Sequence, residues 1–430
     1  MNILLLFSHF NTLEQAGSLR SWQTARFLTK QGHNVTAFAP GVDQRSEELL
    51  PEMHGKLFAE YDIEGVRLIR SYTLSKFRHS AKRRLAYDVV YAVLVFLRAL
   101  IIRSLDIVVV SYPPNVMPAF AYLLAKIRRV PLILEMRDLV SDNLKASNYV
   151  KSSRFVTVVK RFERFTVNHS DHVIVVSNGM KKVLVSRNFN EVKISVVPLG
   201  YEPEAFEAAE YAWNPRDEFG WWDRFVVIFV GTLNLGSDIP TLLKSAERLQ
   251  QHKDILFAIV GEGEMRSEYQ KYCATRGLTN CQFIDYQPRR KIPVILSAAN
   301  VAVLLLPDDP AWVCILSNKT FDYLGSKLPM IYAGRGDAAE LIQEAQAGIV
   351  VPPEDDRSFA EAILRLKGNP AEAKAMGERG HSFVLSNYYM PNLLSDFEEI
   401  LIRSATKGGV NNATTETTHP VVQDPGGPDV

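Results

Sequence analysis

The sequence of 430 residues contains only three cysteines, Cys273, Cys281 and Cys314. So few cysteines give neither a disulfide framework nor the spacing of a metal site. The chain also lacks an excess of charge, since 49 basic residues stand against 48 acidic ones. A nucleic-acid-binding protein normally carries a large basic excess. We therefore expect a protein of a reducing compartment, the cytoplasm, with no nucleic-acid partner and no metal site.

Long apolar runs are absent as well. The best candidate for a membrane span, Tyr87 to Ile102, is shorter than the roughly 20 residues that a span requires, and it contains Asp88 and Arg98. We expect a buried helix of an α/β domain there. The opening MNILLLFSHF lacks the basic region and the cleavage site of a signal peptide, and it predicts a buried first strand.

A basic cluster precedes this apolar run and consists of Lys76, Arg78, Lys82, Arg83 and Arg84. Two readings fit it: a solvated basic face, and peripheral contact with an anionic membrane surface. The sequence leaves both open.

The sequence does contain a repeated alternation of short apolar runs and helical patterns. Strands are predicted at 2–7, 34–40, 106–113, 131–138, 172–177 and 193–200, and again at 224–231, 255–261, 281–286, 300–307, 328–334 and 348–353. Continuous Val/Ile/Leu strands between helices indicate parallel sheets covered on both faces. Because the chain is too long for one core, we predict an α/β protein of two doubly wound, Rossmann-like domains that face a cleft.

The predicted domain bounds follow from breaks in this alternation. Residues 201–224, with prolines, aromatics and mixed charge, are typical of an interdomain connection, so the domains are expected at 1–200 and 201–387. A helix near 388–405 is expected to pack back on the first domain. Residues 407–430 have no apolar periodicity and are expected to be disordered.

Ligands of doubly wound domains bind where strand ends lead into helix N-termini. Gly17 and Ser18 follow the first strand, and glycines follow two successive strands of the second domain, at 231, 236, 261 and 263. Tight turns without a ligand are the usual meaning of such glycines, and an ordinary cap explains Ser18 at least as well as an anion site. The recurrence of glycine at successive strand ends favours a binding cleft.

The most informative stretch is SNKTFDYLGSKLPMI, residues 317–331. It places Ser317, Asn318 and Lys319 at the start of a helix, where free N–H groups, the helix dipole and an ammonium group suit a diphosphate. Asp322 lies on the same face and is suited to a ribose diol. The alternative is a helix cap with an ion pair between Lys319 and Asp322.

In this order the motifs resemble a GT-B glycosyltransferase of the family 4 type, with WbuB-like sequences of bacterial surface-polysaccharide enzymes. The resemblance covers roughly residues 1–405. It rests on segments that include GSLRSWQTARFLTKQGHNVTAFAP, YPPNVMPAFAYLLAKIRRVPLILEMRDLV, FVGTLNLGSDIPTLLKSAERL, FAIVGEGEMRSEYQ and SNKTFDYLGSKLPMI.

The resemblance implies transfer of a hexosyl or N-acetylhexosaminyl group from a UDP or GDP sugar, with retention at the anomeric carbon and no cofactor or essential metal. It implies a saccharide or polyprenyl-linked acceptor, and work in the cytoplasm or at the cytoplasmic face of the inner membrane. The residues that it implies for donor binding are Gly17, Arg20, Gly231, Thr232, Gly261, Glu262, Gly263, Tyr286, Ser317, Asn318, Lys319, Asp322 and Glu340. Glu340 equally fits a carboxylate on a helix surface.

The chain departs from the family pattern at three places. Cys314 and Asp322 stand where many members have two glutamates, and Thr232 with uncharged neighbours stands where many have arginine and lysine. Arg137 and Asp138 follow a strand where a histidine is frequent. We therefore expect Lys319, helped by helix dipoles and by Arg20 or Arg137, to carry the leaving-group charge. Asp138 and Arg137 are catalytic candidates, with a buried structural ion pair as the alternative.

Two other functions remain open from the sequence. A sugar-nucleotide 2-epimerase of the same fold would use the donor pocket without an acceptor. A catalytically degenerate relative would act as a partner subunit, which the missing basic pair makes conceivable.

Overall fold

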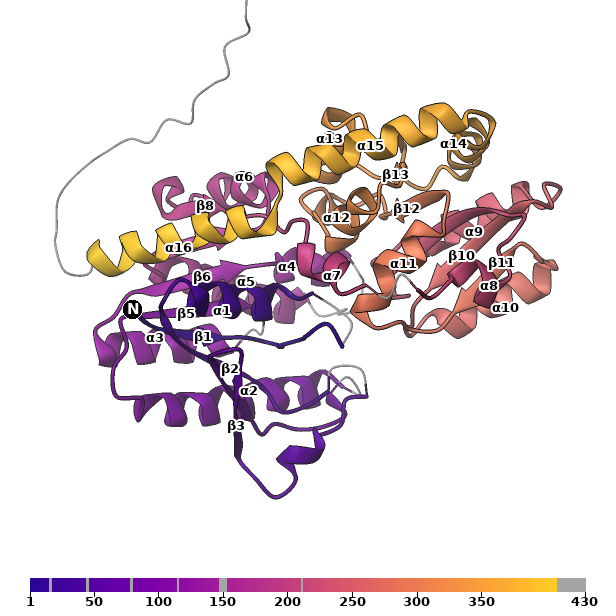
Figure 1. Ribbon diagram of the computed structural model, residues 1–430. Coiled ribbons are helices and arrows are strands. Elements are labelled where there is room, and N and C mark those ends of the chain that lie inside the picture. Colours follow the sequence, from indigo (N-terminus) through magenta and orange to yellow (C-terminus); the bar gives the residue numbers. More distant parts are fainter. Residues whose placement is uncertain are drawn as a thin grey trace, which may run out of the picture.

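The computed structural model describes residues 1–14, 18–43, 46–77, 80–113, 116–146, 153–209 and 212–407. Within these ranges the chain forms two sheets flanked by helices, one in each half of the molecule (Figure 1). Gly17, Arg78 and the predicted tail beyond Lys407 lie outside the described residues.

The first sheet has eight strands in the order β3-β4-β2-β1-β5-β6-β7-β8. All neighbours pair in parallel except β3 and β4, which are antiparallel. The strands are β1 (Asn2–Leu6), β2 (Asn34–Pro40), β3 (Phe58–Ile63), β4 (Val66–Ser71), β5 (Ile107–Tyr112), β6 (Leu132–Met136), β7 (His172–Val175) and β8 (Ile194–Val196). The helices of this half are α1 (Arg20–Lys30), α2 (Ala81–Leu100), α3 (Met117–Arg128), α4 (Val140–Ala146), α5 (Ser153–His169) and α6 (Asn178–Ser186).

The second sheet has six parallel strands in the order β11-β10-β9-β12-β13-β14. They are β9 (Phe225–Val230), β10 (Ile255–Val260), β11 (Cys281–Ile284), β12 (Val301–Leu305), β13 (Met330–Ala333) and β14 (Gly348–Val351). The helices are α7 (Pro203–Glu207), α8 (Pro215–Phe219), α9 (Ile239–Arg248), α10 (Arg266–Arg276), α11 (Ile292–Ser297), α12 (Asn318–Gly325), α13 (Asp337–Glu344), α14 (Asp356–Gly368), α15 (Pro370–Asn387) and α16 (Met390–Lys407). The predicted α/β class with two Rossmann-like sheets is confirmed.

The central strands are hydrophobic throughout because helices cover both faces of each sheet. Every residue of β5 and of β10 is buried. The hairpin of β3 and β4 was not predicted. Its outer strand FAEYDI lies at the sheet edge, buries only Ala59 and exposes the charged Glu60 and Asp62, as edge strands commonly do.

The last two helices join the two halves. α15 and α16 follow one another along one side of the molecule, and α16 runs back across the first half (Figure 1). Phe397 and Leu401 of α16 are buried in the same cluster as Leu5 of β1 and Leu28 of α1.

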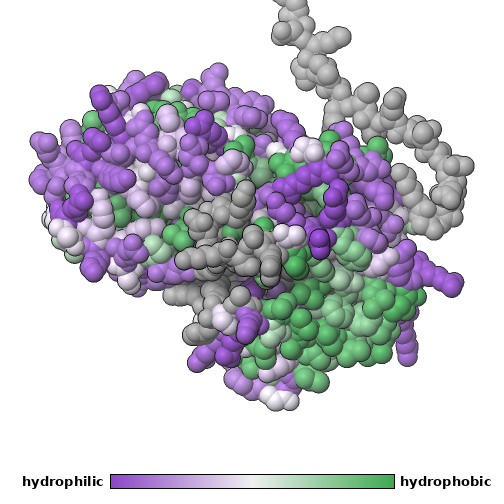
Figure 2. Space-filling model, turned by 180° about the vertical axis from the view of Figure 1, so that it is seen from behind, coloured by the Kyte–Doolittle hydropathy of each residue, from purple (hydrophilic) through white to green (hydrophobic). Residues whose placement is uncertain are grey.

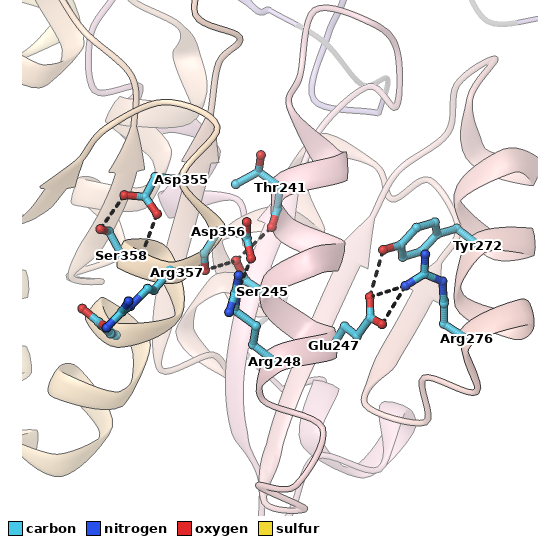
Figure 3. A network of polar contacts seen from close by, with 11 residues as sticks. Thr241, Ser245, Glu247, Arg248, Tyr272, Arg276, Asp355, Asp356, Arg357 and Ser358 are labelled. Atoms are coloured by element: carbon cyan, nitrogen blue, oxygen red, sulfur yellow. Dashed lines mark hydrogen bonds and ion pairs between the residues drawn. The ribbon is translucent and has the colours of Figure 1, made fainter.

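Ion pairs connect three helices of the second half. Glu247 of α9 accepts hydrogen bonds from Tyr272 and Arg276 of α10, and Arg248 of α9 pairs with Asp356 of α14 (Figure 3). The Arg276 and Arg248 side chains are half exposed, which is typical of surface pairs that fasten neighbouring helices at a small gain in free energy. The network is therefore structural.

The helix predicted over 87–102 is longer than expected and only half buried. α2 begins at Ala81, with Ser80 as its N-cap: the Ser80 hydroxyl accepts a hydrogen bond from the Arg83 N–H. Tyr91 and Val95 are buried in the core while Leu97 is 54% exposed, so the expectation of a buried helix holds for one face of α2 only. No helix within the described ranges combines the length and the apolarity that crossing a bilayer requires.

Candidate functional site

The N-terminus of α12 holds a lysine without an ionic partner. Lys319 is half-buried, and no carboxylate of the described chain lies within ion-pair distance of its Nζ. Burial lowers the pKa of Lys319 to about 8, although the negative charge of Asp322 acts in the opposite direction. The ammonium instead lies over the Phe229 ring, 5.2 Å from its centroid. An anion is the partner that such a group lacks.

The polar side chains beside Lys319 do not cap the helix. Ser317 occupies the N-cap position with extended backbone, yet its side chain makes no cap hydrogen bond. Ser317 Oγ and Asn318 Oδ1 are both buried and have no hydrogen-bond partner in the described part of the chain. The alternative of a simple cap with an ion pair is therefore wrong, because neither the cap bond nor a bond from Lys319 to Asp322 is formed.

Tyr323 fixes this helix start against the end of β9. Its hydroxyl accepts a hydrogen bond from the Val230 N–H at 2.9 Å and donates one to the Val230 carbonyl at 3.2 Å. The side chain is fully buried. This contact places Lys319 directly over Gly231, where an added Cβ would lie 2.1 Å from Lys319 Cε.

Glycines at the next strand ends allow two loops to stack. A Cβ on Gly261, whose φ is +142°, would lie 2.0 Å from the Gly231 carbonyl oxygen, and one on Gly263 would lie 2.1 Å from the Leu233 carbonyl oxygen. The Leu233 N–H donates to the Glu262 carbonyl at 2.9 Å. The glycines predicted from the sequence thus bring the β9 and β10 loops together beneath Lys319. Direct contact of these glycines with a donor stays a prediction.

Asp322 has a partner that the sequence did not reveal. Its carboxylate is held by Arg289, whose Nη1 lies 2.7 Å from Asp322 Oδ2, and Arg289 also binds Glu202 at 2.8 Å. All three residues are buried. Burial raises the pKa of Glu202, although the positive charge of Arg289 opposes that shift. The ribose role of Asp322 stays a prediction, and any ribose would meet a carboxylate already fixed by Arg289.

A second buried network lies at the strand ends of the first half. Glu135 of β6 accepts hydrogen bonds from Arg20 at 3.1 Å and from Arg137 at 2.7 Å, and Ser111 donates to it at 3.1 Å. Burial opposes ionisation of Glu135, but Arg137 and then Arg20 outweigh it and lower the pKa to about 2. The motif LILEMRD contains this carboxylate, but sequence reasoning did not identify it as the centre of the network.

Arg20 is fully buried, and its Nε donates to Glu135 while Nη1 donates to the Pro198 carbonyl and to Met390 Sδ. Its Nη2 has no hydrogen-bond partner in the described part of the chain, and the donor role of Arg20 stays a prediction. Arg137 is less buried but is likewise directed at Glu135 and Ser21. The ion pair of this motif is therefore between Arg137 and Glu135, and the expected alternative of a pair between Arg137 and Asp138 is corrected.

Asp138 remains available for chemistry. The hydrogen bond resolved to its carboxylate comes from Asn143, at 3.4 Å. Burial raises the pKa of Asp138 to about 6, while Arg137 acts in the opposite direction. Burial raises the pKa of the Cys314 thiol to about 11, and the charges of Asp337, Asp142 and Asp138 add to this shift. The Asp138 carboxylate therefore lies near the segment that precedes α12.

Direct bonds close the two halves on one another around this region. Ser177 Oγ donates to the Cys314 carbonyl at 2.7 Å, and the Gly179 N–H donates to Asp337 Oδ2 at 2.8 Å. On the other flank Arg290 binds Glu14. The predicted strand ends of both halves therefore meet.

Glu340 lines a pocket of about 420 Å³, to which Leu316, just before Ser317, also contributes. This pocket opens between α6 and α13 and is also lined by Lys182, Glu344 and Tyr388. Glu340 is exposed, which fits the helix-surface alternative as well as a place beside the donor.

Three further predicted residues lie at loop surfaces. Thr232 is exposed, Glu262 pairs with Arg266, and Tyr286 is half-buried. In the described ranges no group of three or more His, Cys, Asp or Glu side chains is arranged to hold a metal ion. The expectation of a metal-free reaction stays a prediction.

Two family models match the chain. "Glycosyltransferase Family 4" matches residues 20–205, and "Glycosyl transferases group 1" matches residues 216–383.

Relatives of known name align with part of the chain. The alpha-D-kanosaminyltransferase of Streptomyces kanamyceticus is 26% identical over 175 residues, which cover 40% of this chain and 44% of that protein. The putative colanic acid biosynthesis glycosyl transferase WcaI of Escherichia coli strain K12 is 23% identical over 180 residues, again 40% of this chain and 44% of that protein. The matched stretches span about half the length of these relatives.

Solved structures align with nearly the whole chain. Sucrose-phosphate synthase from Thermosynechococcus elongatus superposes with a TM-score of 0.73 at 16% identity and covers 94% of this chain and 99% of that one. Anabaena HepE in complex with UDP-glucose superposes with a TM-score of 0.69 at 13% identity and covers 94% and 100%. At such identities the likeness shows the fold.

Two facing doubly wound sheets, with polar groups gathered at their opposed strand ends, define a protein of the GT-B fold. The family models cover both halves, and the chain belongs to the family 4 glycosyltransferases.

Proposed function

We propose that the chain transfers a sugar from a nucleoside-diphosphate sugar, of the UDP or GDP type, to a hydroxyl of a saccharide or lipid-linked acceptor. The proposal rests chiefly on Lys319, an ammonium at a helix N-terminus that is seated on Gly231 and has no ionic partner among the described residues. The buried, unbonded oxygens of Ser317 and Asn318 lie beside it. Helix N–H groups and a cation suit the two phosphates of such a donor.

In this proposal the leaving diphosphate gains negative charge as the glycosidic bond breaks, and the sugar becomes oxocarbenium-like. Lys319 and the N-terminus of α12 bind that charge more strongly in the transition state than in the ground state, which lowers the barrier. We further propose that the configuration at the anomeric carbon is retained and that the donor carries a hexosyl or N-acetylhexosaminyl group. The crystallised relative HepE binds UDP-glucose, which supports a sugar nucleotide as the donor class.

On the acceptor side we propose Asp138 as the group that touches the incoming hydroxyl. Its carboxylate lies near the segment before α12, and its raised pKa of about 6 makes it a better proton acceptor than an ordinary aspartate. The biological setting that we propose is synthesis of a bacterial surface polysaccharide at the cytoplasmic face of the inner membrane.

A thermal-shift panel tests the donor assignment. The wild type is heated with UDP, GDP, ADP, CMP and their sugars, because a ligand that binds the folded state more tightly stabilises it more at a given concentration. We expect one nucleoside diphosphate to raise the melting temperature of the wild type and to have a much smaller effect on Lys319→Ala. The absence of a shift with every nucleotide would contradict the proposal and would favour a non-enzymatic partner subunit.

A further inference from the structure

The N-terminal half exposes a continuous apolar face that the sugar-nucleotide site does not use. Figure 2 shows a broad hydrophobic area on this half when the molecule is seen from behind. The large exposed side chains come from α2 and the residue after it, from α3 and from α5: Leu85, Val89, Leu97, Ile101, Leu123, Ile127, Phe155 and Val158. We call this set the α2/α3/α5 face. Monomeric soluble proteins rarely expose large contiguous apolar areas without a function.

The face is one surface because its helices pack side by side. Phe96 of α2 contacts Phe120 of α3 edge to face, with ring centroids 5.8 Å apart, and Tyr122 of α3 contacts Phe165 of α5 at 5.6 Å. Along α2 the exposed positions recur at four-residue multiples, which places them on one side of the helix. The apolar positions thus form a stripe beside two shorter ones rather than scattered side chains.

Charge identifies the occupant of this face. Exposed basic residues border it on all three helices: Lys82, Arg83, Lys126, Lys160, Arg161 and Arg164. The acidic residues of the three helices are Asp88 and Glu163, and both are buried. The exposed charges of these three helices are therefore basic, although the whole chain is nearly neutral. An apolar surface edged with cations fits a bilayer interface that carries anionic headgroups.

The face also borders the candidate site. α4 begins at Val140, two residues after Asp138, and packs against both α5 and the short turn Pro310–Trp312 of the second half. A bilayer that covers the face therefore lies next to the loop that carries Asp138.

We infer that the α2/α3/α5 face docks the protein on an anionic membrane surface, with the apolar side chains in the interface and the cations at the headgroups. The inference builds on the proposed lipid-linked acceptor, for which it names the surface. In this inference the main contact with the membrane is the apolar face, and not the basic cluster before Tyr87 that the sequence suggested. A second copy of the chain is the competing occupant.

Co-sedimentation with vesicles tests the inference on the full chain. Wild type should bind vesicles of phosphatidylglycerol and phosphatidylethanolamine, and should bind phosphatidylcholine vesicles far less. The double variant Leu97→Ser, Ile101→Ser should weaken binding on the order of tenfold or more, because two half-exposed apolar side chains no longer enter the interface. Lys160→Glu, Arg161→Glu should weaken it on the order of fivefold for each cation removed, at low salt. Val192→Ser is the matched control, since Val192 is 87% exposed but lies outside the face.

The outcomes separate membrane contact from self-association and from the donor site. Absent binding to anionic vesicles, or equal binding by the wild type and the Leu97→Ser, Ile101→Ser variant, would overturn the inference. Sedimentation equilibrium on the same variants tests the second copy: a dimer that these substitutions dissociate, without loss of vesicle binding, would overturn it too. The nucleotide thermal shift is measured in parallel. If wild type binds vesicles but shows no thermal shift with any nucleotide, only the donor proposal is refuted. If wild type shows the nucleotide shift but does not bind vesicles, only the membrane inference is refuted.

Discussion

Replacing Gly231 by alanine should displace the ammonium group of Lys319, on which the proposed chemistry depends, without removing it. The added Cβ would lie 2.1 Å from Lys319 Cε and 2.7 Å from Nζ. Non-bonded carbon atoms are normally about 3.5–4.0 Å apart, so the lysine chain must retreat by roughly 1.5 Å. Since the obstructed group is the outer part of a flexible side chain, the free energy of unfolding should change by no more than about 1 kcal/mol.

The effect on catalysis should be much larger. A displacement of about 1 Å from the productive geometry can cost on the order of 10²-fold, and loss of one charge-stabilising contact costs about 10²–10³-fold in rate. We expect kcat/KM of Gly231→Ala to fall by about 10²-fold, close to the value for Lys319→Ala. The assay follows release of the nucleoside diphosphate from the donor by coupled spectrophotometry, with urea unfolding alongside.

Gly368→Ala is the matched control, because nothing lies within 4 Å of a Cβ at that position. The double variant Gly231→Ala, Lys319→Ala should be no worse than Lys319→Ala alone, since both changes affect the same ammonium. A folded Gly231→Ala variant whose kcat/KM stays within about threefold of wild type would contradict this prediction. A double variant whose loss of kcat/KM equals the product of the two single losses would contradict it as well.

Four further predictions concern neighbouring groups. Affinity for the nucleoside diphosphate should fall as pH rises above about 8, because the pKa of Lys319 in the unliganded protein is lowered to about 8 and the neutral amine no longer attracts the diphosphate. Calorimetry from pH 7 to 9.5 measures the affinity, and a flat profile would show a lysine with an ordinary pKa. Glu135→Gln should lower the free energy of unfolding in urea by about 3–5 kcal/mol, because it leaves two buried guanidinium groups without a carboxylate; the exposed Glu361→Gln should lower it by less than about 0.5 kcal/mol. Since the folded pKa of Glu135 is lowered from 4.5 to about 2, this stabilisation is present above pH 4.5 and is lost as pH falls towards 2. Equal acid sensitivity of variant and wild type would contradict this. Asp138→Asn should leave unfolding at pH 8 unchanged or raise its free energy, because burial penalises the charged carboxylate, and should still lower kcat; retained kcat would remove Asp138 from the chemistry. Gly179→Ala should lower kcat without a comparable loss of stability, because its Cβ would lie 2.7 Å from Asp337 Oδ2 and so force apart a bond between the two halves, and unchanged kcat would show that this contact does not matter for turnover.

The sequence was informative about the fold because buried parallel strands are nearly continuous apolar runs. The strands β1, β5 and β10 could be located from NILLLF, DIVVVSYP and ILFAIVG alone. The hairpin of β3 and β4 was missed because its edge strand mixes charge with apolar positions. The exposure of α2 was missed for a related reason: an exposed apolar stripe and a core-facing stripe have the same spacing, so only the packing of α3 and α5 separates them.

At the site, sequence reasoning found the positions on single loops but not the pairings between distant segments. It placed Lys319 and Gly231 at strand ends, which the structure brings into contact. It did not find Arg289, which lies 33 positions from Asp322 and pairs with it only because α12 and the segment before α11 meet in the fold. The partner of Arg137 was likewise misassigned, since Asp138 is one position away in sequence and Glu135 is two, yet the structure pairs Arg137 with the buried Glu135.

Donor cleavage tests the central claim most directly and requires no acceptor. The nucleotide sugar that stabilises the protein is incubated with wild type and with Lys319→Ala, and the products are separated by anion-exchange chromatography. We expect wild type to release the nucleoside diphosphate and free sugar slowly, and Lys319→Ala to do so about 10²–10³-fold more slowly. Release of a nucleoside monophosphate with sugar phosphate, epimerisation of the intact sugar nucleotide, or equal rates for the two proteins would contradict it.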